Sequence, residues 1–181
     1  MALKKRWYDI IAPKMFGEKV IGETLSADPK QLVGRRIDLN LMELSRKYSK
    51  FYIKILLQIE KLEDGKAYTK LIGHECLRER IYRMVQRRLR RVDVIQDITT
   101  KDGKKVRIKT VFVLLRRVGT SLRSAARKKA KDAIERIASS KDLENLMEAI
   151  ISGDFQNEVR KEVNKIYPVG NLEIRKTEIS Q

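Results

Sequence analysis

The sequence predicts an α+β fold, with an antiparallel β-barrel-like core, flanking helices and a C-terminal helical segment. Between about residues 33 and 118, apolar residues recur at every second position, as in strands with one buried face. Two Asp-Gly pairs, at 64–65 and 102–103, interrupt this alternation where a tight hairpin can turn. After Gly119 the apolar period becomes 3.6, so strands come first and helices follow, as expected of an α+β chain.

One strand followed by two hairpins is predicted. The first strand covers residues 33–41. In the first hairpin, the strand at residues 51–59 is joined through the turn at Asp64-Gly65 to a return strand at residues 66–73. The second hairpin spans residues 92–117. Five or more antiparallel strands with one apolar face can close into a barrel, which removes exposed sheet edges.

An arginine-rich helix is predicted between the hairpins, near residues 76–91. Its apolar positions follow helical spacing, with Ile81, Val85, Leu89 and Val92 on one stripe. The stretch RMVQRRLRR carries five arginines, and like charges three or four positions apart on a helix repel by roughly 0.2–0.5 kcal/mol per pair. We expect the apolar stripe to dock on the sheet and the arginines to face an anionic partner.

The rest of the chain predicts helices and a closing strand. Residues 119–167 begin with a long helix, whose basic row of Arg123, Arg127 and Lys131 lies beside an apolar stripe. Two shorter helices follow, and Pro168 ends the last of them.

A single domain over residues 1–181 is predicted. Within it, residues 1–20 are a basic N-terminal arm, residues 21–118 the β-rich core, and residues 168–181 the closing strand and tail.

The net charge of +17 is concentrated in one third of the chain. Residues 76–131 carry nineteen basic and four acidic side chains, a net charge of +15, which draws a polyanion. Arginine favours nucleic acid, because its planar guanidinium binds phosphate through two hydrogen bonds and stacks on bases. A membrane would require a broad apolar face beside the basic one, and residues 78–92 offer only a narrow stripe.

Features of several other protein classes are lacking. Cys76 is the only cysteine, which excludes a disulfide framework and a cysteine-based zinc site. No apolar run follows the basic N-terminus as in a signal peptide, and the longest such run, VFVLL, is too short to span a bilayer. We therefore expect an intracellular protein without a metal or a cofactor.

Catalysis has one candidate pair, His74 and Cys76 in the stretch GHEC. Two positions apart in a strand, these side chains share a face, and an imidazole beside a thiol can activate it. No third group that would orient the imidazole is evident, and no second histidine has zinc-protease spacing. We predict a protein that is not an enzyme; an RNA-modifying enzyme is a rival interpretation.

The stretch KKRWYD interleaves basic and aromatic side chains near the N-terminus. Aromatic rings beside cations can stack on unpaired bases, which is one interpretation of Trp7. The other is that Trp7, the only tryptophan, anchors the arm to the core.

Six strings follow one another along the chain: KKRWYDIIAPKMF, IGET, DPKQLVGR, GHE, TTKDGKKVR and KIYPVGNLEIRKTE. Their order and spacing closely resemble the archaeal and eukaryotic small-subunit ribosomal protein family S-one-e, also called S-three-A-e. The resemblance spans nearly the whole chain, and the compact ending after EIRKTE is typical of archaeal members. Cys76 and Leu77 depart from the family pattern, which has a threonine there, so the cap of the arginine-rich helix is in doubt.

The resemblance implies a structural constituent of the small ribosomal subunit, which supports translation in the cytoplasm. Members are built around a β-barrel and lie on the platform, near the 3′ end of the rRNA and the mRNA exit. They contact small-subunit rRNA and neighbouring ribosomal proteins, and near the exit site mRNA is a further expected partner. The alternative is a free RNA-binding chaperone or translational regulator, which meets RNA only transiently.

The charge pattern predicts one continuous RNA-binding surface made of the arginine-rich helix, the second hairpin and the first long helix. A-form RNA is recognised mainly through shape and backbone, so this surface positions the protein and does not read sequence. The predicted contacts, with the basic arm included, are Lys4, Lys5, Arg6, Arg83, Arg87, Arg88, Arg90, Arg91, Lys104, Lys105, Arg107, Lys109, Arg116, Arg117, Arg123, Arg127 and Lys131.

Overall fold

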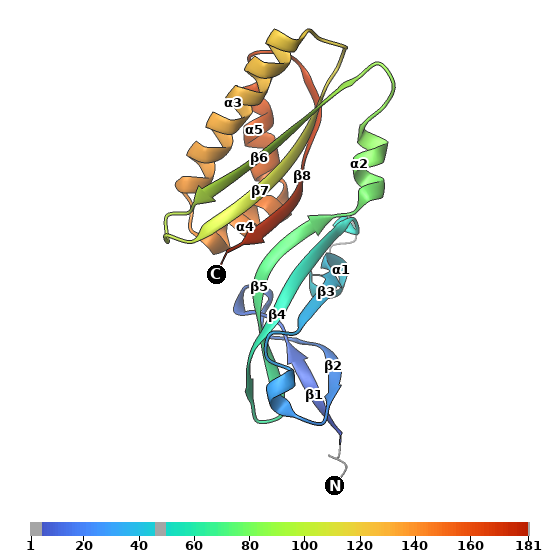
Figure 1. Ribbon diagram of the computed structural model, residues 1–181, viewed down its shortest axis with the longest axis vertical. Coiled ribbons are helices and arrows are strands. Elements are labelled where there is room, and N and C mark those ends of the chain that lie inside the picture. Colours follow the sequence, from blue (N-terminus) through green and yellow to red (C-terminus); the bar gives the residue numbers. More distant parts are fainter. Residues whose placement is uncertain (1–4, 46–49, 181) are drawn as a thin grey trace. The chain divides into compact units, whose positions relative to one another are not determined.

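The structure is a computed structural model that describes residues 5–45 and 50–180 (Figure 1). These residues form eight β-strands, five α-helices and two short 3-10 helices. The chain divides into two compact units, Met1–His74 and Glu75–Gln181, and each is described by itself.

The first unit consists of five strands with short helices between them. The strand order is β2-β1-β5-β4-β3, in which β1 pairs with β5 in parallel and with β2 in antiparallel orientation. The elements are β1 (Arg6–Ile11), β2 (Val20–Ser26), β3 (Arg36–Asn40), α1 (Leu41–Ser45), β4 (Ile53–Glu63) and β5 (Lys66–Cys76), with 3-10 helices at Lys14–Phe16 and Pro29–Gln31. The last two residues of β5 belong to the second unit.

The strands of the first unit curl around a small core, but they do not close a barrel. Tyr8, Leu32, Ile59 and Ala67 form that core. Within the described part of the chain, no backbone pairing joins the outer strands β2 and β3. The side chain of Arg35 bridges toward β2 instead, since its Nη1 donates to Thr24 Oγ1 at 2.5 Å. The α+β class is thus confirmed, and the barrel description applies only loosely because the sheet stays open.

The hairpin between β4 and β5 turns at Asp64-Gly65, as predicted. Asp64 has a φ of 50° and Gly65 a φ of 76°. Positive φ at both central residues characterises the type I′ turn, whose twist matches that of the flanking strands. Local turn chemistry therefore sets the register between these two strands.

The Gly65→Ala substitution should lower the free energy of unfolding by about 1–2 kcal/mol, because a Cβ is unfavourable at positive φ. Gly22→Ala in β2 is the matched control: a Cβ there meets nothing within 4 Å and its φ is ordinary. That control should raise stability by up to about 1 kcal/mol, since alanine restricts the unfolded chain. Urea denaturation of both variants measures the difference, and equal changes would contradict the backbone explanation.

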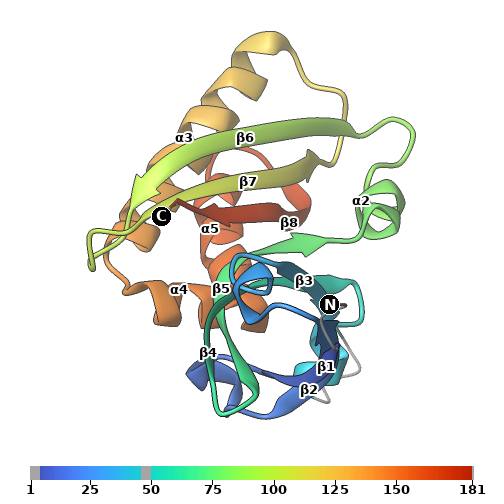
Figure 2. The same ribbon diagram turned by 60° about the horizontal axis from the view of Figure 1, so that its bottom comes forward.

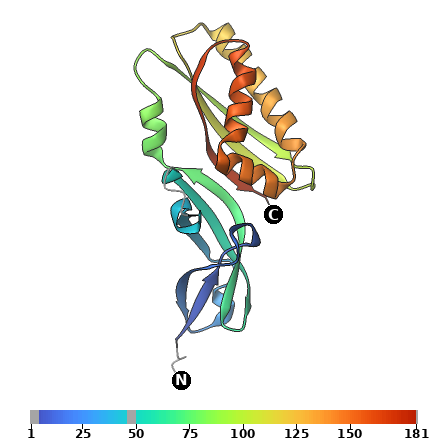
Figure 3. The ribbon, with the colours of Figure 1, turned by 180° about the vertical axis from the view of Figure 1, so that it is seen from behind.

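The second unit is a three-stranded antiparallel sheet with helices on one face. β7 (Lys105–Leu114) lies between β6 (Arg90–Thr99) and β8 (Val169–Ile179), and Figure 2 shows the three strands side by side. The helices that cover one face (Figure 3) are α3 (Thr120–Ser139), α4 (Leu143–Ser152) and α5 (Asp154–Asn164). Helices over residues 119–167 followed by a closing strand were predicted, and both are present.

The core of this unit lies between the sheet and the helices. In β7, alternate residues are buried from Val106 onward, and from Thr110 to Leu114 every residue is buried. Small side chains on α3 let the helix approach the sheet closely, as the complete burial of Ala126 and Ala130 shows. None of the described helices has the length and apolar character that a bilayer crossing requires.

The arginine-rich helix is shorter than predicted. It is α2 (Arg78–Met84), and its N-cap Leu77 provides no side-chain hydrogen bond. The chain then turns at Arg87-Arg88, where Arg88 has a φ of 67°, and enters β6 at Arg90. The prediction of helix near 76–91 is therefore wrong beyond Met84. Pairing of Arg90 with Leu114 on β7 stabilises a strand there, and such long-range pairing overrides a weak helical pattern.

Candidate nucleic-acid interface

Five arginines gather at one end of the β6–β7–β8 sheet. Because Arg90 pairs with Leu114, the loop before β6 and the loop after β7 leave the sheet at the same end (Figure 1). We call the arginines of these two loops, with the first residue of β6, the sheet-end cluster: Arg87, Arg88, Arg90, Arg116 and Arg117. Four are exposed and Arg90 is half-buried. Across residues 5–45 and 50–180, none of the five forms an ion pair with a carboxylate.

The basic row on α3 continues from this cluster. α3 begins three residues after Arg117, and Arg123, Arg127 and Lys131 follow at intervals of four on one side of the helix. Arg127 and Lys131 are exposed and Arg123 is half-buried. Residues four positions apart are neighbours on a helix, so the three cations form a stripe about 12 Å long.

The cations of the β6–β7 hairpin lie at the other end of the strands. Lys104 and Lys105 are exposed next to the turn at Asp102-Gly103. A ten-residue strand, about 33 Å long, separates them from the sheet-end cluster. The sheet-end cluster and the hairpin lysines thus lie at opposite ends of β6, and the α3 row runs along β6 between them, since Gln96 donates to the Lys131 carbonyl at 3.3 Å. One continuous surface over all of these residues stays a prediction.

Three of the predicted contacts already have acidic partners. Arg107 donates from Nε to Asp97 Oδ1 at 2.6 Å and from Nη2 to Oδ2 at 2.8 Å, which lowers the pKa of Asp97. Arg91 Nη2 lies 2.7 Å from Asp93 Oδ1, and Lys109 Nζ lies 2.8 Å from Glu178 Oε1. These cations are only partly available to RNA phosphates, because binding would have to compete with an existing pair.

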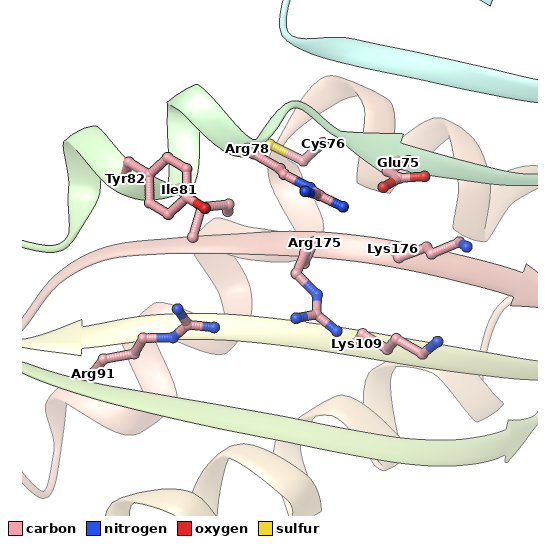
Figure 4. Close-up of a pocket in the computed structure, with 9 residues that line it drawn as sticks. All are labelled: Glu75, Cys76, Arg78, Ile81, Tyr82, Arg91, Lys109, Arg175 and Lys176. Carbon is pink, nitrogen blue, oxygen red and sulfur yellow. The ribbon is translucent and has the colours of Figure 1, made fainter. Parts of the chain in front are cut away.

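A groove on the open face of the sheet contains cations that the sequence pattern did not reveal. It has a volume of about 390 Å³ and is bordered by α2 and by the outward side chains of β6, β7 and β8 (Figure 4). Arg78, Arg175 and Lys176 line it together with Arg91 and Lys109. The remaining predicted residue of α2, Arg83, is exposed on the same short helix.

The basic arm contributes exposed side chains at the start of β1. Lys5 and Arg6 are exposed, and Lys4 lies outside the described residues. Trp7 is 66% exposed and pairs across the strands with Leu25. The interpretation that Trp7 anchors the arm to the core is therefore wrong, because an anchoring side chain would be buried. Stacking of Trp7 on a base stays a prediction.

Comparison with known proteins decides the family. The ribosomal S3Ae family matches residues 2–181. The chain is 37% identical to small ribosomal subunit protein eS1 of Methanoculleus marisnigri, over 98% of this chain and 90% of that protein. It is 35% identical to the protein of the same name from Methanothermobacter thermautotrophicus, over 97% of this chain and 90% of that protein, and 33% identical to that of Saccharolobus islandicus, over 97% and 84%.

The chain belongs to the ribosomal S3Ae family. This confirms the predicted family and agrees with the prediction that the protein is not an enzyme.

The S3Ae-family chain buries its only cysteine and its only histidine. Cys76 is 3% exposed and His74 is 2% exposed. Burial, and next the negative charge of Glu173, raise the pKa of the Cys76 thiol to about 12. The thiolate is the nucleophilic form, so this thiol is inert near neutral pH. Nor do His, Cys, Asp and Glu side chains of the described segments gather into a site that could hold a metal ion.

Alkylation of Cys76 by iodoacetamide should be slow in the folded S3Ae-family protein. A pKa of about 12 instead of 9.0 reduces the thiolate fraction at pH 8 roughly a thousandfold, and burial restricts access further. We expect the rate in native buffer to be at least about 100-fold below that in urea, measured by mass spectrometry. A native rate within tenfold of the rate in urea, an order-of-magnitude margin, would mean that the thiol is reactive and would reopen the enzymatic interpretation.

Proposed function

We propose that this protein is a structural constituent of the archaeal small ribosomal subunit, binding rRNA and neighbouring ribosomal proteins in the cytoplasm. The finer placement that we propose is the platform of the subunit, near the mRNA exit, where the protein supports translation. Family membership and three archaeal relatives that carry the name small ribosomal subunit protein eS1 support this role.

The sheet-end cluster is the observation that carries the rRNA-binding proposal. Its arginines come from two loops that are brought together by the pairing of β6 with β7, and they have no acidic partners within the described chain. Like charges held together without counter-charges raise the energy of the free protein. Phosphates of RNA remove that repulsion, and each guanidinium can donate two parallel hydrogen bonds to them.

The mode of binding that follows is contact with the RNA backbone. The cluster and the adjoining α3 row present cations on loops and on a helix, most of them exposed. Such contacts position a protein on A-form RNA through its phosphates and shape. The predicted contacts Arg83, Lys104 and Lys105, with the arm residues Lys4, Lys5 and Arg6, are secondary sites in this proposal.

The C-terminal helices are the proposed side for a protein neighbour. Residues 132–181 contain seven basic and ten acidic side chains. The net negative charge of this segment repels RNA phosphates and attracts a basic ribosomal protein. Glu144 and Glu148 are exposed on α4.

Sedimentation tests residence in the subunit. The protein should remain with small subunits through a sucrose gradient at high salt, because a resident ribosomal protein is held by many phosphate and protein contacts together. A free chaperone or regulator that meets RNA transiently would instead stay at the top of the gradient, and this result would overturn the proposal.

A further inference from the structure

A β-bulge turns two consecutive cations of β8 onto the open face of the sheet. Lys109 of β7 pairs with Lys176, but the next residue, Thr110, pairs with Ile174, so Arg175 is an extra residue in β8. Ile174 and Thr177 on either side are both buried. In an unbroken strand, one of the two residues between them would face the helices; the bulge turns both Arg175 and Lys176 outward (Figure 4).

The bulge places these cations in the groove beneath α2. An ion pair between Arg80 and Glu173, at 2.8 Å, fixes α2 against β8, so the groove has a defined wall. Arg78 enters from α2 and Arg175 from β8 (Figure 4). Neither forms an ion pair with any carboxylate of the described segments. Two guanidinium groups that reach into one groove from opposite walls repel each other until an anion lies between them.

The other cations of the groove each form an ion pair with a carboxylate, which singles out these two arginines. Glu178 Oε1 accepts from Lys109 at 2.8 Å and lies 3.2 Å from Lys176 Nζ. Arg91 is held by Asp93. Glu75 also lines the groove, and its charge offsets only part of that of the two arginines, so the groove can accommodate an anionic group such as an RNA phosphate.

One end of the groove is aromatic. Tyr82 is 69% exposed there, and Figure 4 shows it on α2 at the same end of the groove as Arg91. Ile81 and Cys76 add an apolar lining. An exposed ring beside cations provides a flat surface on which a nucleobase can stack, independently of base identity. The volume of about 390 Å³ lies within the range of about 300–1,000 Å³ that small-molecule sites occupy.

We propose that this groove captures a single unpaired nucleotide of RNA, with its phosphate between Arg78 and Arg175 and its base against Tyr82. The site rests on the proposed rRNA-binding function and adds a second mode to it. The sheet-end cluster binds the phosphate backbone of RNA. The groove selects single-stranded RNA, because a base stacked inside a duplex cannot also stack on the Tyr82 ring.

Fluorescence anisotropy with two probes tests the groove: a short labelled single-stranded RNA and the same RNA annealed to its complement. Tyr82→Ala and Arg175→Gln should each lower affinity for the single strand by about tenfold or more. Tyr82→Phe keeps the ring and should change it by less than about twofold. Lys161→Gln, which removes one exposed charge from α5, is the control for net charge. Affinity for the duplex should be unchanged by Tyr82→Ala.

The outcomes separate this inference from the function on which it rests. If Tyr82→Ala binds the single strand as tightly as the unaltered protein does while the duplex still binds, the nucleotide site is wrong and the rRNA-binding function stands. If the unaltered protein binds neither probe, both proposals fail. If polyglutamate displaces the single strand from the unaltered protein and binds Tyr82→Ala equally well, the groove serves an acidic peptide and the inference is overturned.

Discussion

Replacing Arg87, Arg88, Arg116 and Arg117 with glutamine should lower the affinity for an rRNA platform fragment about 100-fold or more at 0.1 M salt. Each phosphate contact releases condensed counterions, so four lost contacts should also reduce the slope of log affinity against log salt by about 4. Filter binding over a series of salt concentrations measures both quantities. The four side chains are exposed and form no ion pair within the described residues, so the fold should remain intact.

The matched control for this variant removes the same charge elsewhere. Lys14, Lys19, Lys30 and Lys54 are exposed in the first unit, and their replacement by glutamine changes the net charge equally. If RNA is held by a local cluster, the control should lose less than about fivefold in affinity. Equal losses in the two variants would show that overall charge attracts the RNA, and would contradict the assignment of the sheet-end cluster.

The Phe112→Ala substitution should have the largest effect on stability, lowering the free energy of unfolding by about 3–5 kcal/mol. Phe112 is completely buried in the central strand β7 and pairs with Val92 and Leu172 on its two neighbours. The variant loses the free energy gained by burying the apolar ring away from water, and it leaves a cavity in a densely packed core. Urea denaturation followed by circular dichroism measures the loss.

Ile95→Ala is the control for Phe112→Ala in the same sheet. Ile95 is 55% exposed in β6, so its truncation should cost only about 0.5 kcal/mol. A similar loss in both variants would mean that the interior of the second unit does not depend on the ring of Phe112.

The elements that could be predicted from sequence are those set by local chemistry. The turn at Asp64-Gly65 needs only two residues that tolerate positive φ, and the C-terminal helices carry a 3.6-residue period with clear stops. The end of α2 could not be predicted in this way. It depends on the pairing of Arg90 with Leu114, more than twenty residues away, and no local pattern records that partner.

The sequence predicted which part of the chain supplies the cations of the candidate site, but only partly how those cations are arranged and paired. A count of charges identified the basic third of the chain, but could not show that Asp97 neutralises Arg107 or that Glu178 neutralises Lys109. Arg175 and Lys176 were missed because strict alternation turns only one of two neighbouring residues outward. The signal for the bulge is the spacing of Ile174 and Thr177, and a polar threonine on the buried face conceals it.

The pairing of β7 with β8 has a consequence for the order in which the protein folds during synthesis. Val106 pairs with Ile179 and Leu114 with Val169, so the strand that completes this sheet is made long after β6 and β7. Contacts between residues so far apart in sequence form slowly, because closing the long loop between them costs conformational entropy before any contact energy is gained. The arginines of the sheet-end cluster therefore emerge from the ribosome before the sheet that positions them is complete. During that interval the nascent segment is a flexible polycation, and it gains its specific shape only when β8 is added.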